Sequence, residues 1–205
     1  MKTERPDRVG AVVLAAGQAR RFASPKLLMP FGDSTVLGCV VAALEAAGVD
    51  PIVVVVAGYA AQIAESLRGT GARLVRNPAP ERGMLSSVRV GVASLPCGLK
   101  GYLIALGDQP RIQPDEIRRL LSEHCRSEKG LAVPTYRGKR GHPVVFDQRY
   151  REEILALTDE QTLRDLIHSH PDEVLEVDCG SDAFVRDIDV REDYEREIRR
   201  SLGRQ

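Results

Sequence analysis

The chain has 205 residues and equal numbers of basic and acidic side chains, 29 of each, so its formal net charge is zero. This balance argues against sequence-independent nucleic-acid binding, which favours a basic excess, and no apolar run approaches the ~20 residues that a transmembrane helix needs. The charged start, residues 1–8, lacks the apolar core of a signal peptide. The four cysteines lack zinc-site spacing and indicate reduced thiols. We therefore expect one cytoplasmic domain over residues 1–205, with no nucleic acid or membrane as partner.

Apolar runs alternate with helical patterns along the chain, as in βαβ units around a mostly parallel sheet. Asp33 or Ser34 is a competent N-cap for the first helix, which should stop at Gly48. The predicted strands are 9–15, 52–57, 73–76, 101–106, 131–134, 143–146 and 173–177. The predicted helices are 34–47, 60–68, 84–94, 114–126, 149–157, 161–168 and 191–202.

The segment 135–142 (TYRGKRGH) interrupts this alternation. Two glycines and three basic residues between two apolar runs predict a protruding hairpin or loop. A loop carried by a rigid sheet is a common place for substrate contacts, and an ordinary solvated turn is an equal alternative.

The stretch 14–26 (LAAGQARRFASPK) leaves the first predicted strand and brings three cations, Arg20, Arg21 and Lys26. A triphosphate needs backbone N–H donors in a concave loop together with arginine or lysine, and ligands of open α/β sheets bind beyond the carboxyl ends of strands. The dinucleotide fingerprint G-x-G-x-x-G and the P-loop pattern are both absent from this stretch. It therefore suggests a phosphate cradle of another kind, with a solvated basic turn as the alternative.

Two further segments suit a nucleotide site. Asp108, in the sequence LGDQP after the strand 101–106, would project into the same crevice, where a carboxylate oxygen suits Mg²⁺. From the residues alone, an ordinary turn aspartate is an equal alternative. Gly83, Ser86 and Ser87 open the helix 84–94, where small residues and N–H donors can meet a nucleotide or simply cap the helix.

The stretch 14–26 resembles the L-A-[AG]-G-x-S-x-R-[MF]-G-x-x-K signature of the MobA-like nucleotidyltransferases, in which this loop wraps the triphosphate. The match places Arg21 and Lys26 on the family's arginine and lysine. Ala19 and Ala23 stand where Ser and Gly are usual, and both are small enough to leave the cradle intact. LGDQP is similar to the family's G-D-[QM]-P, which implies that Asp108 is a magnesium ligand.

Three later segments extend the resemblance. Residues 185–194 (VRDIDVREDY) resemble D-I-D-T-P-E-D-Y, which implies Asp189 as the second metal ligand and makes Asp187 the less favoured candidate. Residues 77–91 (NPAPERGMLSSVRVG) are similar to the family's N-P-x-x-x-x-G-M-x-x-S-[LV]-x-x-G. The sequence 141–143 (GHP) resembles a segment on the acceptor side, where His142 would contact an acceptor phosphate or pterin, or else stabilise the turn.

The resemblance implies a fold, a Rossmann-like three-layer α/β/α nucleotidyltransferase fold with a mostly parallel central sheet and a small β-hairpin insertion on the acceptor side. It also implies a nucleotide site in the first loop and at the start of the helix 84–94. The implied nucleotide-binding residues are Leu14, Ala15, Ala16, Gly17, Arg20, Arg21, Lys26, Gly83, Ser86 and Ser87. Either Arg20 or Arg21 could make the chief triphosphate contact.

The function that the resemblance implies is Mg²⁺-dependent transfer of CMP from CTP to the terminal phosphate of molybdopterin, with release of pyrophosphate. LAAG together with GDQP and GHPV is more similar to the branch that attaches CMP than to the GMP branch, which tends to carry LAGG. The implied partners are CTP, the molybdenum cofactor, and a molybdenum hydroxylase or its maturation factor. The alternatives are transfer from GTP or to another acceptor such as a sugar phosphate, and a cofactor-insertion chaperone that transfers nothing.

The chemistry of the acceptor decides which residues catalysis needs. A phosphate monoester is mostly dianionic at neutral pH and needs no general base. Catalysis would then rest on positioning and charge neutralisation, with Arg21, Lys26 and Asp108 as the catalytic residues. The pair Asp108 and Asp189 counts against the chaperone, since a carrier has no need of catalytic magnesium.

Overall fold

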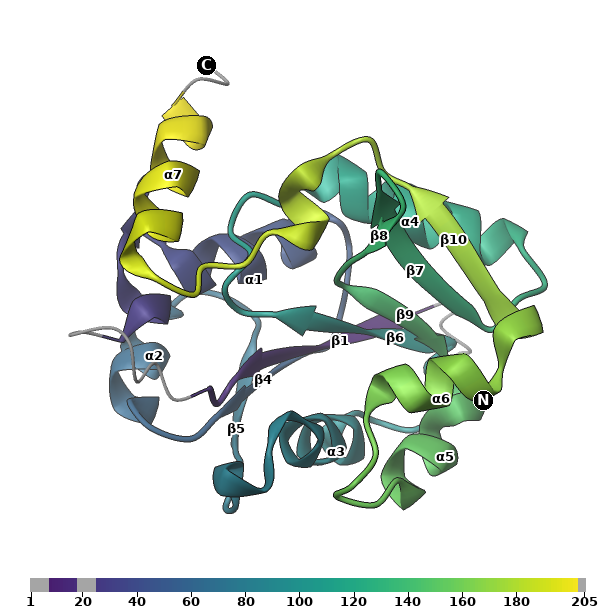
Figure 1. Ribbon diagram of the computed structural model, residues 1–205. Coiled ribbons are helices and arrows are strands. Elements are labelled where there is room, and N and C mark those ends of the chain that lie inside the picture. Colours follow the sequence, from purple (N-terminus) through teal and green to yellow (C-terminus); the bar gives the residue numbers. More distant parts are fainter. Residues whose placement is uncertain (1–7, 18–24, 203–205) are drawn as a thin grey trace, which may run out of the picture.

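The computed structural model describes residues 8–17 and 25–202, and an eight-stranded sheet forms its middle layer (Figure 1). The strands are β1 Val9–Ala15, β4 Ile52–Val56, β5 Arg73–Arg76, β6 Gly101–Leu106, β7 Leu131–Tyr136, β8 Lys139–Arg140, β9 Val144–Asp147 and β10 Val174–Asp178. Their order is β10-β7-β9-β6-β1-β4-β5, with β8 paired to β7. Within this order β9 is antiparallel to its neighbours β6 and β7, and the other pairs are parallel.

Helices cover both faces of the sheet (Figure 1). The helices are α1 Val36–Ala46, α2 Ala60–Ser66, α3 Met84–Ser94, α4 Pro114–Arg126, α5 Arg151–Ala156, α6 Leu163–Ser169 and α7 Arg191–Leu202. One hydrophobic cluster joins one face of the sheet to α1, α2, α4 and α7, and a second joins the other face to α3, α5 and α6. The predicted three-layer α/β/α arrangement around a mostly parallel sheet is confirmed.

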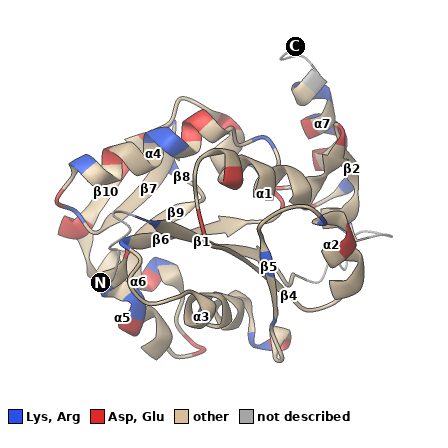
Figure 2. Ribbon diagram, turned by 180° about the vertical axis from the view of Figure 1, so that it is seen from behind, with Lys and Arg blue, Asp and Glu red and all other residues tan. Residues whose placement is uncertain are grey.

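The central strands show why their sequences are almost continuously apolar. In β1 the fully buried Ala11 and Val13 belong to the first cluster, whereas the intervening Val12 belongs to the second. Alternate residues of a strand point to opposite faces, so a strand covered on both faces must be apolar at every position. Figure 2 shows that charged residues gather on the outer helices, with both signs on α4 and α7. The strands β1, β4, β6 and β7 contain no charged residue.

Two predictions of local structure had different outcomes. The hairpin predicted at 135–142 is confirmed: β7 and β8 pair through a turn at Arg137 and Gly138, both with positive φ. The N-cap predicted for α1 is wrong, because residues 30–35 form a small antiparallel pair, β2 Pro30–Phe31 and β3 Ser34–Thr35. The helix therefore begins later, and Thr35 caps it by accepting a hydrogen bond from the N–H of Gly38 at 3.0 Å.

The carboxyl ends of β1 and β6 meet at one edge of the sheet. The N–H of Gly107 donates to the Leu14 carbonyl oxygen at 3.1 Å, and a Cβ at Gly107 would lie 3.0 Å from that oxygen. A glycine therefore allows the two strand ends to approach closely, and this edge is where ligands of open α/β sheets bind. Within the described ranges, none of the helices combines the length and apolar character needed to cross a bilayer.

Candidate functional site

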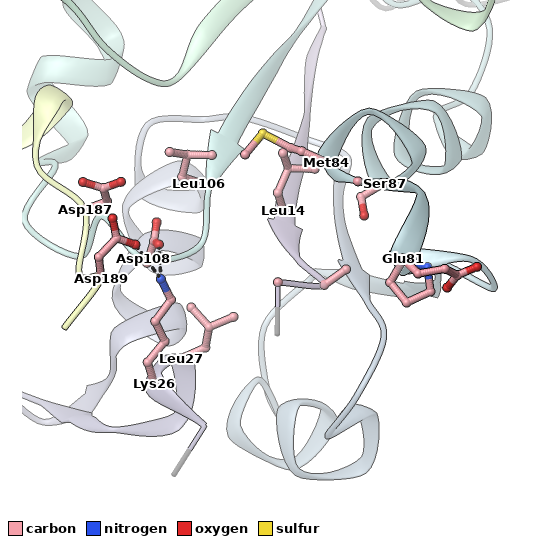
Figure 3. A pocket seen from close by; sticks show the side chains of 14 residues that line it. Leu14, Lys26, Leu27, Glu81, Met84, Ser87, Leu106, Asp108, Asp187 and Asp189 are labelled. Atoms are coloured by element: carbon pink, nitrogen blue, oxygen red, sulfur yellow. Dashed lines mark hydrogen bonds and ion pairs between the residues drawn. The ribbon is translucent and has the colours of Figure 1, made fainter. Parts of the chain in front are cut away.

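A cavity of about 450 Å³ opens at the carboxyl ends of β1 and β6 (Figure 3). This volume lies in the usual range for small-molecule sites. Aspartates and a lysine form one wall, and the start of α3 with the preceding short 3-10 helix, Pro80–Arg82, forms the other. The lining residues are Leu14, Ala16, Gly17, Lys26, Leu27, Pro80, Glu81, Gly83, Met84, Ser87, Leu106, Asp108, Asp187 and Asp189.

The first wall contains three carboxylates from distant parts of the chain. Asp108, Asp187 and Asp189 each offer an oxygen atom, and these atoms lie within 4.8 Å of one another. The fully buried Ile188 separates the last two, and its N–H donates to the Asp108 carbonyl oxygen at 3.2 Å. This backbone bond holds the segment before α7 against the end of β6, so that the three carboxylates meet.

Lys26 faces the carboxylates. Its Nζ donates to Asp108 Oδ2 at 2.6 Å and to the Ile188 carbonyl oxygen at 2.7 Å, and it lies 3.4 Å from Asp189 Oδ1. The side chains of Lys26 and Asp108 are each only 15% exposed, so water screens their interaction weakly. One ammonium thus faces three carboxylates, and the cluster as described has an excess of negative charge.

The cluster fits a divalent cation. Asp108 Oδ1 is buried without a hydrogen-bond partner among the described residues, although a buried carboxylate oxygen normally has one. Desolvation raises the pKa of Asp187, and the charges of Asp189 and Asp108 raise it further. Hard oxygen ligands with mutual repulsion are the donor set that Mg²⁺ or Mn²⁺ favours. Asp187, which the sequence ranked below Asp189, belongs to the cluster.

The opposite wall presents the start of a helix. Gly83 has φ 90° and ψ −178°, a conformation that glycine adopts without strain. The N-terminus of α3 has no side-chain cap among the described residues, and the first N–H groups of such a helix can bind an anion or another acceptor. Met84, with 62% of its surface exposed, lies at this edge of the cavity.

The two serines predicted at this helix start differ in position. Ser87 lines the cavity, whereas Ser86 does not and instead donates to the carbonyl oxygens of Ala79 and Gly83. Asn77, buried and not singled out in the sequence, donates from Nδ2 to both serine hydroxyls, at 2.8 and 2.9 Å. Asn77 therefore shapes this wall. The Asn-Pro pair that begins the segment 77–91 is the feature of the sequence that could have identified it.

The remaining predicted residues divide into three groups. Leu14, Ala16 and Gly17 line the cavity, whereas Ala15 is buried in the core. Arg20 and Arg21, together with the substituted positions Ala19 and Ala23, lie outside the described residues. Five lining residues were not predicted, although each lies in or beside a motif that was, namely Leu27, Pro80, Glu81, Met84 and Leu106.

His142 lies beside the cluster and does not line the cavity. Its N–H donates to the Phe184 carbonyl oxygen at 2.9 Å. Burial lowers the pKa of the imidazole, while the charge of Asp187 raises it. The structure thus brings His142 within electrostatic reach of Asp187, and its contact with an acceptor stays a prediction.

The strand order and a polar site at the strand ends define an α/β nucleotidyltransferase fold. The chain matches the MobA-like NTP transferase domain over residues 11–174, and it belongs to that family.

Solved structures and curated proteins resemble the chain over most of its length. Rv0371c from Mycobacterium tuberculosis H37Rv, in complex with manganese, is 30% identical with a TM-score of 0.74, covering 94% of this chain and 98% of that one. A nucleotidyl transferase from Methanothermobacter is 25% identical with a TM-score of 0.84, covering 97% and 99%. Nicotine blue oxidoreductase of Paenarthrobacter nicotinovorans is 28% identical over 193 residues, 90% of this chain and 93% of the relative.

A second group of relatives is longer. The chain is 30% identical over 140 residues to the bifunctional protein GlmU of Micrococcus luteus, and the match spans 64% of this chain and 28% of GlmU.

Proposed function

We propose that this protein is a divalent-metal-dependent nucleotidyltransferase that moves a nucleoside monophosphate from a nucleoside triphosphate onto a phosphorylated acceptor. One observation carries the proposal: a cluster of three aspartates and Lys26 faces the uncapped start of α3 across a single cavity. The cavity thus pairs a cation site with backbone N–H donors. Both are needed to hold a triphosphate and to stabilise its departing part.

Asp108 and Asp189, with Asp187 beside them, would hold Mg²⁺. When bound, the ion supplies positive charge to the phosphate oxygens of the nucleotide and of the acceptor. Asp108 Oδ1, which has no hydrogen-bond partner among the described residues, would gain a partner in the bound ion. Manganese in the Rv0371c complex supports a divalent cation in the family.

The reaction itself requires little proton transfer. An oxygen of the acceptor phosphate attacks the α-phosphorus, a new phosphorus–oxygen bond forms, and the bond from the α-phosphorus to the bridging oxygen breaks to release pyrophosphate. The acceptor phosphate is already deprotonated at neutral pH, so positioning and charge stabilisation supply the rate enhancement. Lys26, with Arg20 or Arg21 in the preceding loop, would stabilise the charge of the triphosphate and of pyrophosphate.

We further propose CTP as the nucleotide and the terminal phosphate of molybdopterin as the acceptor. The LAAG, GDQP and GHPV segments support this choice through their resemblance to the branch that attaches CMP. His142 would contact the acceptor, and a molybdenum hydroxylase or its maturation factor would receive the product. A single cytoplasmic domain over residues 1–205 stays a prediction.

Pyrophosphate release tests the proposal. The purified chain is incubated with Mg²⁺ and molybdenum cofactor, and CTP, GTP and ATP are compared. We expect release that depends on both CTP and the acceptor. Release with GTP alone would overturn the choice of nucleotide, and failure with every nucleotide despite measurable metal binding would overturn transferase activity on this acceptor.

An aspartate variant tests the site. Asp108→Asn removes a charged ligand while preserving shape, and we expect turnover to fall by roughly 10²- to 10³-fold. Asp115→Asn is the matched control, because the Asp115 side chain is 89% exposed on α4. Full turnover of Asp108→Asn in Mg²⁺ would refute the metal assignment.

A further inference from the structure

A network of ion pairs, buried at its centre, surrounds Arg111, three residues after Asp108. Arg111, with only 5% of its side chain exposed, donates from Nη2 to Asp182 Oδ1 at 2.7 Å and from Nε to Glu197 of α7. Glu197 is itself 2% exposed. Asp182 also accepts from Arg186 Nε at 2.8 Å and from Arg200 Nη1 at 2.5 Å.

The network joins the two chain segments that carry the carboxylates. Arg111 follows Asp108 by three residues, on the segment that leaves β6. Asp187 and Asp189 lie between its two partners, Asp182 and Glu197, in the sequence. One guanidinium therefore binds both ends of the segment that carries two of the three proposed ligands.

Neutral hydrogen bonds connect the same two segments. Gln109 Nε2 donates to the Phe184 carbonyl oxygen at 3.2 Å, and the Ile188 N–H donates to the Asp108 carbonyl oxygen at the same distance. These bonds set the spacing of the backbones. The planar guanidinium adds direction, because its Nε and Nη2 hydrogen-bond to two carboxylates at fixed angles.

Stability alone gives a weak reason for this network. Moving ions out of water costs free energy, and their mutual attraction barely offsets this cost. Apolar residues of equal volume therefore often stabilise a fold as well or better. Orientation gives a stronger reason, because groups that hold metal ligands in place strongly affect metal affinity. Placed behind the proposed cation site, the network is suited to hold three mutually repelling carboxylates together.

We propose that Arg111 is a positioning residue, which through Asp182 and Glu197 holds the Asp187–Asp189 segment against Asp108 in the geometry that binds a divalent cation. The proposal rests on the cation site proposed above. It assigns α7 a part in the site through Glu197, although Glu197 lines no part of the cavity.

Direct binding of Mn²⁺ to the full chain, without nucleotide, tests the proposal. Arg111→Lys keeps the positive charge but cannot bridge two carboxylates with a rigid fork. We expect its dissociation constant for Mn²⁺, measured by titration calorimetry, to rise roughly tenfold or more. Arg89→Lys is the matched control, because Arg89 also bonds a carboxylate and a backbone carbonyl, those of Asp159 and Leu157, on the opposite face of the sheet. We expect this control to bind Mn²⁺ with wild-type affinity, even if its stability in urea falls as much as that of Arg111→Lys.

Three results separate the possibilities. Wild-type affinity in a folded Arg111→Lys variant would overturn the positioning role and leave the proposed function standing. Absence of Mn²⁺ binding by the wild-type chain would overturn the cation site and this inference together. If circular dichroism shows that Arg111→Lys is unfolded, Glu197→Gln replaces it: the milder change should also weaken Mn²⁺ binding, and unchanged affinity would overturn the inference.

Discussion

Lys26 would compete with a metal ion for the same carboxylates. Its ammonium contacts Asp108 Oδ2 and lies near Asp189 Oδ1. A cation entering the cluster must displace this lysine or share the carboxylates with it. Once displaced, the ammonium would be free to turn toward phosphate oxygens in the cavity, so metal binding and phosphate binding would support each other.

Replacement of this lysine separates the two roles. In Lys26→Met we expect turnover to fall roughly 10²-fold or more, because a charge on the departing pyrophosphate loses its partner. We expect affinity for Mn²⁺ in the absence of nucleotide to be equal or higher, because the competitor is gone. Pyrophosphate release and calorimetry measure the two effects. Lys129→Met, which removes a bond to the Val174 carbonyl oxygen, serves as the control. A loss of Mn²⁺ affinity in Lys26→Met would contradict the competition.

Asp182 makes stability depend on pH. Burial would raise the pKa of its carboxyl, but hydrogen bonds from Arg111 and Arg186 lower it to about 2, below the ordinary 3.8. A carboxyl with a lowered folded-state pKa stabilises the fold above its unfolded-state pKa, and this contribution is lost as the pH falls from about 4 through 2. The shift corresponds to about 1 to 2 kcal/mol once partial screening is allowed for.

We therefore expect Asp182→Asn to be less stable than the wild type at pH 6, by about 1 to 2 kcal/mol, and the difference to shrink by pH 3. Urea unfolding at several pH values measures it. A difference that stays constant from pH 6 to pH 3 would show that the charge of Asp182 contributes nothing.

At the scale of elements, the start of α3 depends on the backbone of Gly83. Its φ of 90° is costly for any residue with a Cβ, although no atom of the described residues lies within 4 Å of where that Cβ would be. The cost of replacing Gly83 is therefore backbone strain and not a steric clash. A substitution would have to rotate the backbone at the start of α3, which lines the cavity.

Gly83→Ala should cost about 1 to 3 kcal/mol of stability and raise the dissociation constant for the nucleotide severalfold, because the helix start would shift. Gly48→Ala is the matched control, since Gly48 has φ 84°, equally open space, and a position after α1. We expect it to lose stability without losing nucleotide affinity. Equal affinities in both variants, measured by calorimetry with CTP, would exclude the α3 start as a nucleotide contact.

At the scale of the whole molecule, the cluster joins parts of the chain that meet only on folding. Lys26 and Asp108 are 82 positions apart, and Lys26 and Asp189 are 163 apart. A ligand that binds this cluster binds the folded state alone, so it must stabilise the entire fold.

Mn²⁺ at 100 times its dissociation constant should add about 2.7 kcal/mol, which corresponds to a rise in Tm of roughly 5 to 10 °C for a chain of this size. Thermal unfolding with and without EDTA measures the shift. Asp189→Asn should abolish most of it, and an unchanged shift in that variant would remove Asp189 from the site.

Much of the fold could be predicted from the sequence, because strands that are buried on both faces of the sheet consist almost entirely of apolar residues. The bounds of β1, β5, β6, α3, α4 and α7 were predicted as observed. The motifs that follow β1 and β6 placed Lys26 and Asp108 at one edge of the sheet for the same reason: parallel strands end together. Local hydrogen bonding was harder to predict from the sequence, as the small β2–β3 pair before α1 shows.

The sequence by itself thus determined the family, the three layers of the fold, and the segments that border the cavity. Only the tertiary structure decided that Asp187 joins Asp108 and Asp189, that Ser87 and not Ser86 lines the cavity, and that Arg111 pairs with Glu197 of α7. Each helix or strand has its own pattern of apolar residues, so its buried face can be predicted from its local sequence. Side-chain contacts between distant segments depend on distances of a few ångströms, which packing sets and no local pattern records.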